Sequence, residues 1–148
     1  MRTTCGFYIL NKDRKLLICH PTKHPDTIWS IPKGIKDKGE DELDAAKREL
    51  MEETNINFSI LEKHIEKCIV FDKISHPKWN KGKKELFSAL LVCDTDFSNF
   101  ELRCDSYVNN DLTFPEIDEF RWVDLDESYN FLHPIQQINI ETIKKIIS

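Results

Sequence analysis

The first part of the chain alternates between β-type hydrophobic runs and turn-forming residues. Residues 3–10 and 15–20 are rich in β-branched, aromatic and other apolar side chains, and residues 11–14 (Asn-Lys-Asp-Arg) separate them. This pattern predicts a β-hairpin. Further strand-like runs lie at residues 28–31, 68–74, 86–94 and 119–124, and the first of these is stopped by Pro32-Lys33-Gly34.

Residues 41–54 change to the period of a helix. Leu43, Ala46 and Leu50 are spaced i, i+3 and i+7 and form one apolar stripe. Asp41 suits the N-cap, and Asn55 stands where helices commonly end in a left-handed residue.

The end of the chain also predicts a helix, with Pro134 in its first turn. We expect its buried face to consist of isoleucines, namely Ile135, Ile138, Ile143, Ile146 and Ile147. Strands with an interposed helix and a C-terminal helix predict an α/β (α+β) fold, in which helices cover a mixed sheet. Residues 96–115 show no readable pattern.

Composition is that of an ordinary soluble globular protein, with 40% hydrophobic and 32% charged residues among 148. This length predicts one domain over residues 1–148. The net charge of −5 argues weakly against broad binding to nucleic-acid backbones. Residues 40–53 hold seven acidic and two basic side chains, so the rest of the chain sums to zero.

The cysteines and the N-terminus favour a cytoplasmic location. The five cysteines include no C-x-x-C pair, which argues against a disulfide scaffold or a structural zinc site. The sequence has no signal-peptide pattern and no run of about 20 apolar residues that would span a membrane.

Three carboxylates lie on one face of the predicted helix at 41–54. Glu49, Glu52 and Glu53 are spaced i, i+3 and i+4, and like charges at that spacing repel. A divalent cation would relieve the repulsion, and hard oxygen ligands suit Mg²⁺ or Mn²⁺. A solvated acidic face is the alternative, and spacing alone does not choose between the two.

The residues around these carboxylates resemble the Nudix box of the Nudix hydrolases, G-x5-E-x7-R-E-U-x-E-E-x-G-U with U aliphatic. The matching positions are Gly34, Glu40, Arg48, Glu49, Leu50, Glu52, Glu53 and Ile56. Asn55 stands where the family has Gly, a mild change because Asn tolerates positive φ next best. The resemblance implies an αβα sandwich that covers the whole chain.

The resemblance also implies the roles of individual residues. Glu49, Glu52 and Glu53 would bind Mg²⁺ or Mn²⁺, and the backbone carbonyl around Lys33 and Gly34 would add an oxygen ligand. Arg48 and Glu40 would form a supporting ion pair that orients the carboxylates. The implied reaction is hydrolysis of a nucleoside diphosphate linked to another moiety, with water attacking a phosphorus atom.

The general base and the substrate contacts are less defined. Glu52 and Glu53 are candidates for the base within the box, and Glu116, with Glu119 as competitor, is the downstream candidate. Lysines around His76 and Trp79 predict substrate contacts for Lys83 or Lys84, while Trp79 offers a stacking platform. Lys33 is a further candidate because it adjoins Gly34. The histidines show no metal-binding spacing, and His133 is placed to cap the last helix.

Three functions follow from these features. The first is a pyrophosphohydrolase of dinucleoside polyphosphates or related nucleotides, because Trp29-x-x-Pro32-Lys33-Gly34 is similar to a run in Nudix enzymes acting on diadenosine polyphosphates and diphosphoinositols. The second is an RNA 5′-pyrophosphohydrolase, whose family members carry Gln in place of that Lys. The third is a non-catalytic nucleotide-sensing module, disfavoured because such modules usually lose box carboxylates. Whether the chain is a monomer or a homodimer stays open.

Overall fold

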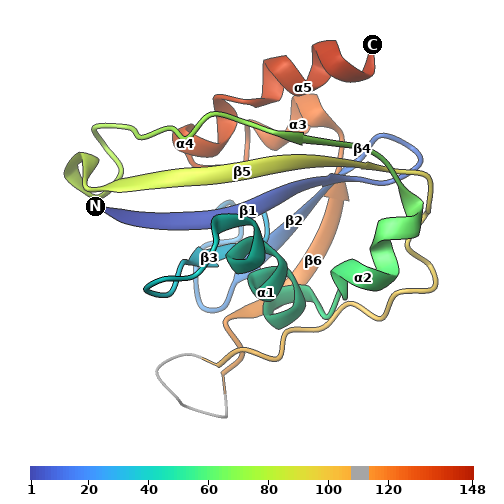
Figure 1. Cartoon of the computed structure of the whole chain (residues 1–148), viewed down its shortest axis with the longest axis horizontal. Coiled ribbons are helices and arrows are strands. Elements are labelled where there is room, and N and C mark those ends of the chain that lie inside the picture. Colours follow the sequence, from blue (N-terminus) through green and yellow to red (C-terminus); the bar gives the residue numbers. More distant parts are fainter. Residues whose placement is uncertain (108–113) are drawn as a thin grey trace.

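A computed structural model describes residues 1–107 and 114–148, and it is organised around one mixed six-stranded sheet (Figure 1). The sheet order is β4-β5-β1-β2-β6, and β3 pairs with β1 off this path. The strands are β1 (Arg2–Leu10), β2 (Leu16–Pro21), β3 (Lys33–Ile35), β4 (Ile65–Val70), β5 (Lys84–Cys93) and β6 (Ile117–Val123).

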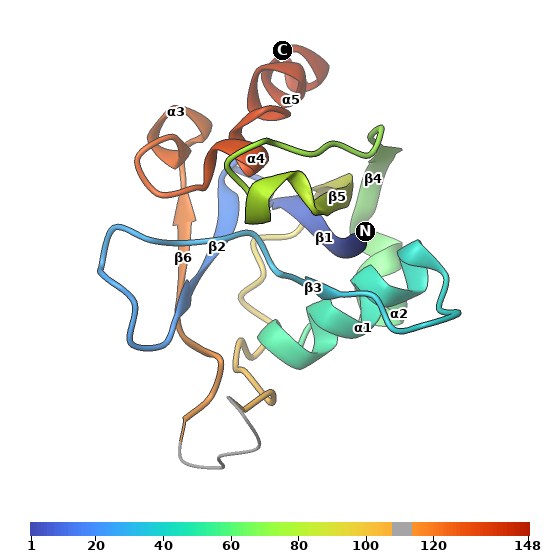
Figure 2. The same ribbon diagram turned by 90° about the vertical axis from the view of Figure 1, so that its left-hand side faces the viewer.

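Five α-helices and two short 3-10 turns complete the described fold. They are α1 (Glu42–Thr54), α2 (Phe58–Leu61), α3 (Leu125–Ser128), α4 (Pro134–Gln137) and α5 (Ile140–Ile147), with 3-10 turns at Glu62–His64 and Asn80–Gly82. Figures 1 and 2 show α1 and α5 on opposite sides of the sheet. The predicted class, helices on a mixed sheet, is confirmed.

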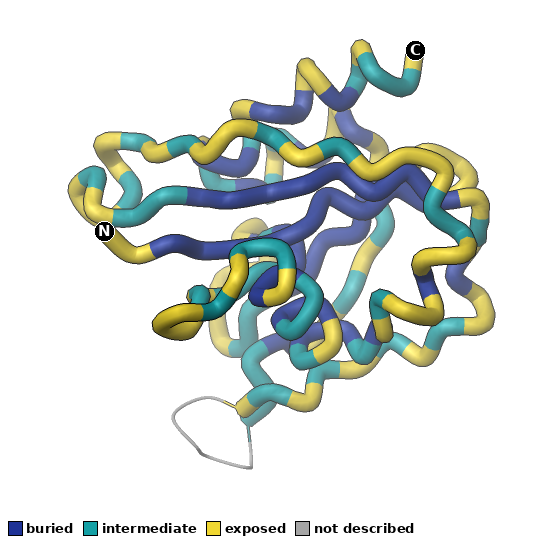
Figure 3. The backbone as a smooth tube through the Cα atoms, in the orientation of Figure 1, coloured by how far each residue is buried: buried dark blue, intermediate teal, exposed yellow. Residues whose placement is uncertain are grey.

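Strand β1 is buried on both faces and therefore divides the hydrophobic core into two layers (Figure 3). Phe7 and Ile9 face the cluster that contains Leu50 of α1. The alternate residues of β1, Tyr8 and Leu10, face the cluster beneath α5. Period-two alternation in one strand thus holds the two helical layers against a common sheet.

The partners of β1 explain where the sheet opens beside α1. One edge of β1 pairs in parallel with β5 along its whole length. The other edge pairs with β3 through residues 4–6 and meets β2 only where Leu10 faces Leu16. The predicted β1–β2 hairpin is therefore present, but the two strands diverge, and the segment that leads into α1 occupies the space between them.

The short strand lies farther along the chain than the sequence predicts. We expected a strand at residues 28–31 ended by Pro32-Lys33-Gly34, yet β3 comprises Lys33–Ile35, and Ser30 forms only an isolated bridge with Cys19. The cause is the close approach of β3 to Gly6, where a Cβ would lie 2.6 Å from the Pro32 carbonyl oxygen. A side chain at position 6 would prevent this pairing.

The C-terminal segment forms two helices instead of the single one predicted. The break lies at Asn139, whose side-chain amide donates to the Ser88 hydroxyl at 3.4 Å. Ile135 and Ile143 are buried as expected, but Ile138 is 47% exposed, so its predicted burial is wrong. None of the helices in the described part of the chain is long and apolar enough to cross a membrane.

Candidate functional site

Helix α1 carries the acidic row and is held in place at both ends. The Asp41 carboxylate accepts hydrogen bonds from the backbone N–H groups of Leu43 (3.0 Å) and Asp44 (3.2 Å), which is the predicted N-cap. Asn55 ends the helix with φ 66°, the predicted left-handed conformation. Ala46 and Leu50 bury one face of the helix, so its carboxylates are turned toward β3.

Replacing Asn55 with glycine is expected to leave both turnover and stability nearly unchanged. Glycine removes the cost of a left-handed residue that carries a Cβ, a gain of about 1 kcal/mol. It also removes the hydrogen bond from the Asn55 side-chain amide to the Glu101 carbonyl at 3.0 Å, which costs a similar amount. Thermal unfolding and steady-state rates of the two proteins test this. A large gain in turnover would show that position 55 takes part in the chemistry.

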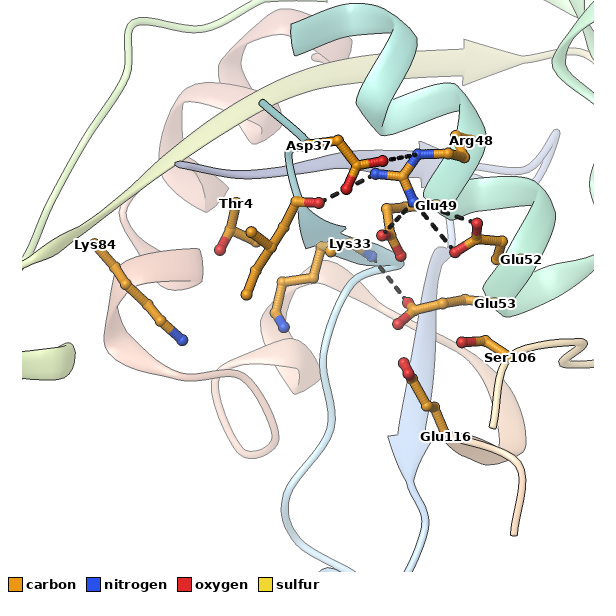
Figure 4. A pocket seen from close by; sticks show the side chains of 12 residues that line it. Thr4, Lys33, Asp37, Arg48, Glu49, Glu52, Glu53, Lys84, Ser106 and Glu116 are labelled. Carbon is orange, nitrogen blue, oxygen red and sulfur yellow. Dashed lines mark hydrogen bonds and ion pairs between the residues drawn. The ribbon is translucent and has the colours of Figure 1, made fainter. Parts of the chain in front are cut away.

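The carboxylates open into a cavity of about 360 Å³ between α1, β3 and the segment before β6 (Figure 4). Its described lining combines acidic and basic side chains with small polar ones: Thr4, Lys33, Gly34, Ile35, Asp37, Arg48, Glu49, Glu52, Glu53, Lys84, Ser106 and Glu116. All three predicted box carboxylates are therefore brought together with Glu116, which lies more than sixty residues away in the sequence.

Arg48 links the carboxylates to the loop before α1. Its Nε and Nη2 donate to the two carboxylate oxygens of Glu40 at 2.9 and 3.0 Å, the bidentate geometry of a strong ion pair. This contact lowers the pKa of Glu40 to about 2. The Nη1 atom reaches Glu49 at 2.9 Å and Glu52 at 3.3 Å, so one guanidinium orients two members of the acidic row.

Replacing Arg48 with lysine is expected to reduce turnover by about 10- to 100-fold. A single ammonium group keeps the charge but cannot bind Glu40 through two parallel N–H groups and also reach Glu49 and Glu52. Steady-state kinetics measure the loss, and circular dichroism checks that the fold persists. Wild-type turnover in the lysine variant would mean that the orientation of these carboxylates does not limit the reaction.

Glu53 and Glu49 are the most deeply placed carboxylates, with relative exposures of 7% and 8%. Burial raises the pKa of Glu53 to about 8, although the Lys33 charge and the hydrogen bond from the Lys33 N–H (2.9 Å) act against it. Burial and the neighbouring Glu52 charge raise the pKa of Glu49 above its ordinary value. Two partly dehydrated carboxylates are thus held close together, where a positive charge would be strongly stabilised.

Gly34 lies directly against one of these carboxylates. A Cβ built on Gly34 would lie 1.9 Å from the Glu49 carboxyl carbon and 2.1 Å from one of its oxygens. Any residue with a Cβ at position 34 would displace the Glu49 carboxylate, so this position requires glycine. The conformation of the backbone does not require glycine here, because Gly34 does not have a positive φ.

The donor set fits a hard divalent cation, since it consists of three carboxylates on one helix face, of which Glu49 and Glu53 are buried. As they stand, no three imidazole, thiol or carboxylate groups in residues 1–107 and 114–148 are arranged to hold a metal ion. The Arg48 guanidinium contacts Glu49 through one carboxylate oxygen, Oε1. The second oxygen of Glu49 can therefore bind a cation while Arg48 keeps the carboxylate oriented.

The two downstream carboxylates are separated by the fold. Glu116 lines the cavity, and its charge is close enough to raise the pKa values of both Glu49 and Glu53, as a lesser cause after burial. Glu119 instead forms an exposed ion pair with Arg121 at 3.3 Å. The structure therefore places Glu116, and not its competitor, beside the box carboxylates.

The predicted substrate contacts fall into two places. Lys84 lines the cavity, and its pKa is lowered by burial and by the neighbouring charges of Arg2 and Lys33. Lys83 borders a separate hollow of about 430 Å³ with Arg2. Trp79 does not line the cavity but lies beneath the Lys84 ammonium, which is 5.7 Å from the indole centroid.

Sequence reasoning missed several residues around the site. Thr4 and Ser106 line the cavity but belong to no recognised motif, and Asp37, which also lines it, stands at a variable position of the box. His20, assigned no role, is buried and paired with Asp118 at 2.6 Å. His133 caps α4 as predicted, with its Nδ1 accepting from the Ile135 N–H at 3.1 Å. The missed contacts depend on pairings between distant segments, which leave no local pattern.

Three comparisons with known proteins bear on this geometry. Residues 1–146 match the family described as NUDIX domain. A protein of Pelagibacter ubique (strain HTCC1062) named RNA pyrophosphohydrolase is 28% identical over 162 aligned positions, covering 100% of this chain and 94% of its own. The Caenorhabditis elegans Ap4A hydrolase in a binary complex has a TM-score of 0.72 at 19% identity, covering 99% of this chain and 98% of that one.

A second similar structure is reported with a metal ion. It is the bifunctional NMN adenylyltransferase/ADP ribose pyrophosphatase of Francisella tularensis, complexed with AMP and a manganese ion. Its TM-score is 0.71 at 20% identity, covering 97% of this chain and 41% of that chain. At this level of identity both solved structures establish the likeness of fold alone.

Proposed function

The chain belongs to the Nudix family, and from that premise we propose that it removes pyrophosphate from the 5′ ends of triphosphorylated RNA. The coarser statement is already established: it is a Nudix pyrophosphohydrolase, a hydrolase acting on pyrophosphate bonds. We further propose that residues 1–148 form one Nudix domain. The family is generally dependent on divalent metals, and we propose Mg²⁺, or Mn²⁺ in its place, as the cofactor.

The observation that carries the RNA assignment is the full-length similarity to a relative with that name. The Pelagibacter ubique RNA pyrophosphohydrolase aligns with 100% of this chain. The charge distribution is compatible with this substrate, because the negative charge is concentrated in residues 40–53 and the rest of the chain is neutral. Bound cations would offset much of that acidic region, so the net charge is a weak objection to RNA.

Each part of the cavity has a task in this proposal. Glu49, Glu52 and Glu53, with the carbonyl around Lys33 and Gly34, would hold the metal ion, which neutralises charge on the phosphate oxygens and activates water. Lys33 and Lys84 face the same space and bind the negatively charged phosphate chain. Glu116 lies opposite Glu53 and takes the proton from the attacking water as the general base.

A second candidate, hydrolysis of dinucleoside polyphosphates, is favoured by one observation. Lys33 occupies the position where RNA pyrophosphohydrolases resembling this motif carry Gln. Its ammonium charge reaches into the cavity and adds attraction for a long polyphosphate chain. The Ap4A hydrolase structure shares the fold with this chain at 19% identity and does not choose the substrate.

Replacing Glu116 with glutamine is expected to reduce turnover by about 10²–10⁴-fold, because the amide cannot accept a proton from water. Glu119→Gln is the matched control, since that carboxylate lies in an exposed ion pair with Arg121. The KM of both variants should stay near the wild-type value. Undiminished turnover of Glu116→Gln across the pH range would remove Glu116 from the mechanism.

The substrate is tested by kcat/KM on a panel measured with Mg²⁺ and with Mn²⁺. The panel holds triphosphorylated RNA, diadenosine polyphosphates, ADP-ribose, nucleoside triphosphates and nucleotide sugars. We expect triphosphorylated RNA to give the largest kcat/KM and Lys33→Gln to lower cleavage of the diadenosine polyphosphates more than that of RNA. A larger kcat/KM for a diadenosine polyphosphate would reverse the order of the two candidates.

A further inference from the structure

His20 is a buried side chain with hydrogen-bond acceptors on both ring nitrogens. Only 6% of the residue is exposed. Its Nδ1 lies 2.6 Å from the Asp118 carboxylate, and its Nε2 lies 3.0 Å from the His24 carbonyl and 3.2 Å from the Pro25 carbonyl. A neutral imidazole donates from one nitrogen only, so the protonated ring alone satisfies both sides.

These contacts join the connection after β2 to the segment that carries Glu116, which lines the cavity. Asp118 is in β6, two residues after Glu116, whereas His24 and Pro25 are in the connection that follows β2. Figure 2 shows that connection leaving β2 beside β6, its antiparallel partner. The pairing register of the two strands shifts between His20 and Pro21, where this connection begins.

The same connection is also hydrogen-bonded directly to the backbone at Glu116. The Thr22 N–H donates to the Glu116 carbonyl at 2.9 Å, and the Thr22 hydroxyl donates to the Pro115 carbonyl. On the other side, the Glu116 N–H donates to the Ser106 carbonyl at 2.7 Å. The backbone of Glu116 is therefore hydrogen-bonded on one side to Thr22 and on the other to Ser106. The segment that contains Thr22 is in turn held by His20.

We propose that His20, paired with Asp118, is a positioning residue that holds residues 21–25 against residues 115–118 and so fixes Glu116 in the catalytic cavity. This inference rests on the proposed role of Glu116 as the general base. His20 does not line the cavity and touches no reacting group, so its effect on the reaction passes through Thr22 and the backbone of Glu116.

The surroundings of the ring favour its charged form. Burial lowers the pKa of His20, whereas the hydrogen bonds to Asp118 and to the two carbonyls raise it. The second effect is the larger, so the pKa lies above its ordinary value. The charged group in contact with the His20 ring is Asp118. The ring also lies beside the Trp29 indole, with 5.1 Å between the two ring centroids. The Arg121 guanidinium lies over the same indole, 4.5 Å from its centroid.

The pH dependence follows from this arrangement. Above the pKa of His20 the ring loses a proton, and one of its nitrogens then faces an acceptor without a hydrogen to donate. The link between the two segments weakens, and kcat should fall on the alkaline side. Because the group acts on the position of Glu116, KM should change little over the same range.

The test uses two substitutions that each keep one half of the link. The amide of His20→Asn lies near the position of Nδ1 and can still reach Asp118, whereas that of His20→Gln lies near Nε2 and can still reach the carbonyls. We expect either variant to lose about tenfold in kcat with KM within about twofold, and to lose the alkaline fall assigned to His20. His24→Gln is the matched control, since His24 contributes only its backbone carbonyl, and it should behave as wild type.

Hydrogen exchange at the Thr22 amide provides a second readout that needs no turnover. Exchange of this amide should be at least about tenfold faster in both His20 variants than in the wild type and in His24→Gln. The inference would be overturned if the His20 variants kept wild-type kcat and wild-type exchange at the Thr22 amide. It would also be overturned if His24→Gln lost as much kcat as the His20 variants do.

The outcomes also separate this inference from the proposed function. If Glu116→Gln loses turnover while both His20 variants retain it, the positioning role fails and the role of Glu116 stands. If Glu116→Gln is fully active, both the base assignment and the positioning role fail. If the wild type cleaves no member of the substrate panel, the proposed function fails, and Thr22 exchange alone decides whether His20 holds the segment.

Discussion

Replacing Glu53 with glutamine is expected to abolish most turnover while making the metal-free protein more stable. The amide keeps the size of the side chain and still offers an oxygen to the Lys33 N–H, which Glu53 now accepts at 2.9 Å. It cannot supply the negative charge that a divalent cation needs. A loss of about 10²–10³-fold or more in kcat is expected.

The gain in stability has a defined pH dependence. The pKa of Glu53 is raised to about 8 by burial. Between its ordinary pKa and that value, the unfolded chain has released its proton and the folded chain has not, so rising pH lowers the free energy of unfolding of the wild type. Glutamine carries no such penalty. The advantage of Glu53→Gln should therefore be small near pH 4.5 and grow toward pH 8.

Thermal unfolding in the presence of EDTA at both ends of this pH range measures the effect. Glu52→Gln is the control, because the Glu52 side chain is 40% exposed and its charge is solvated. Equal stabilisation of both variants, or none in Glu53→Gln, would show that ionisation of Glu53 does not lower the free energy of unfolding. Wild-type turnover in Glu53→Gln would remove it from the metal site.

The second large effect is expected at Gly34, which contributes no side chain to the site. In Gly34→Ala the new methyl group would lie 1.9 Å from the Glu49 carboxyl carbon, so that carboxylate must leave its position. We expect about a 100-fold loss of kcat, comparable to other misplacements of a group by about 1 Å. The fold should persist, because Gly34 has no positive φ and its pairing with Cys5 uses backbone atoms.

A double-mutant cycle isolates the cause of the Gly34→Ala defect. Glu49→Ala removes the carboxylate that the methyl group meets, and it is expected to be poorly active by itself. Adding Gly34→Ala to that background should cost little more, because the two substitutions act on the same contact. Fully additive losses would mean that Gly34→Ala acts through the backbone and not through Glu49.

The local sequence pattern was sufficient to predict both ends of α1, the helix that carries the site. The cap at Asp41 and the left-handed Asn55 depend on residues within one or two turns, and both are present as predicted. The ion pair between Glu40 and Arg48 likewise joins neighbouring parts of one motif. These features are local, so the motif and the helix period predict them.

Features that depend on distant partners could not be predicted. The position of β3 is set by Gly6, which lets the Pro32 carbonyl approach β1. The break before α5 is marked by the Asn139 contact with Ser88 on β5. His20 looks like an ordinary strand residue until β6 brings Asp118 beside it. The unpatterned stretch at 96–115 includes residues 108–113, which lie outside the described residues.

The most direct test of metal-dependent pyrophosphate hydrolysis by the α1 carboxylates is the rate at which the full chain converts a 5′-triphosphorylated oligonucleotide to the 5′-monophosphate as Mg²⁺ is titrated. We expect saturable activation by Mg²⁺, no turnover in EDTA, recovery when Mg²⁺ is restored, and no activation of Glu53→Gln over the same range. Cleavage at the same rate in EDTA, or full activation of Glu53→Gln, would contradict the assignment of this site.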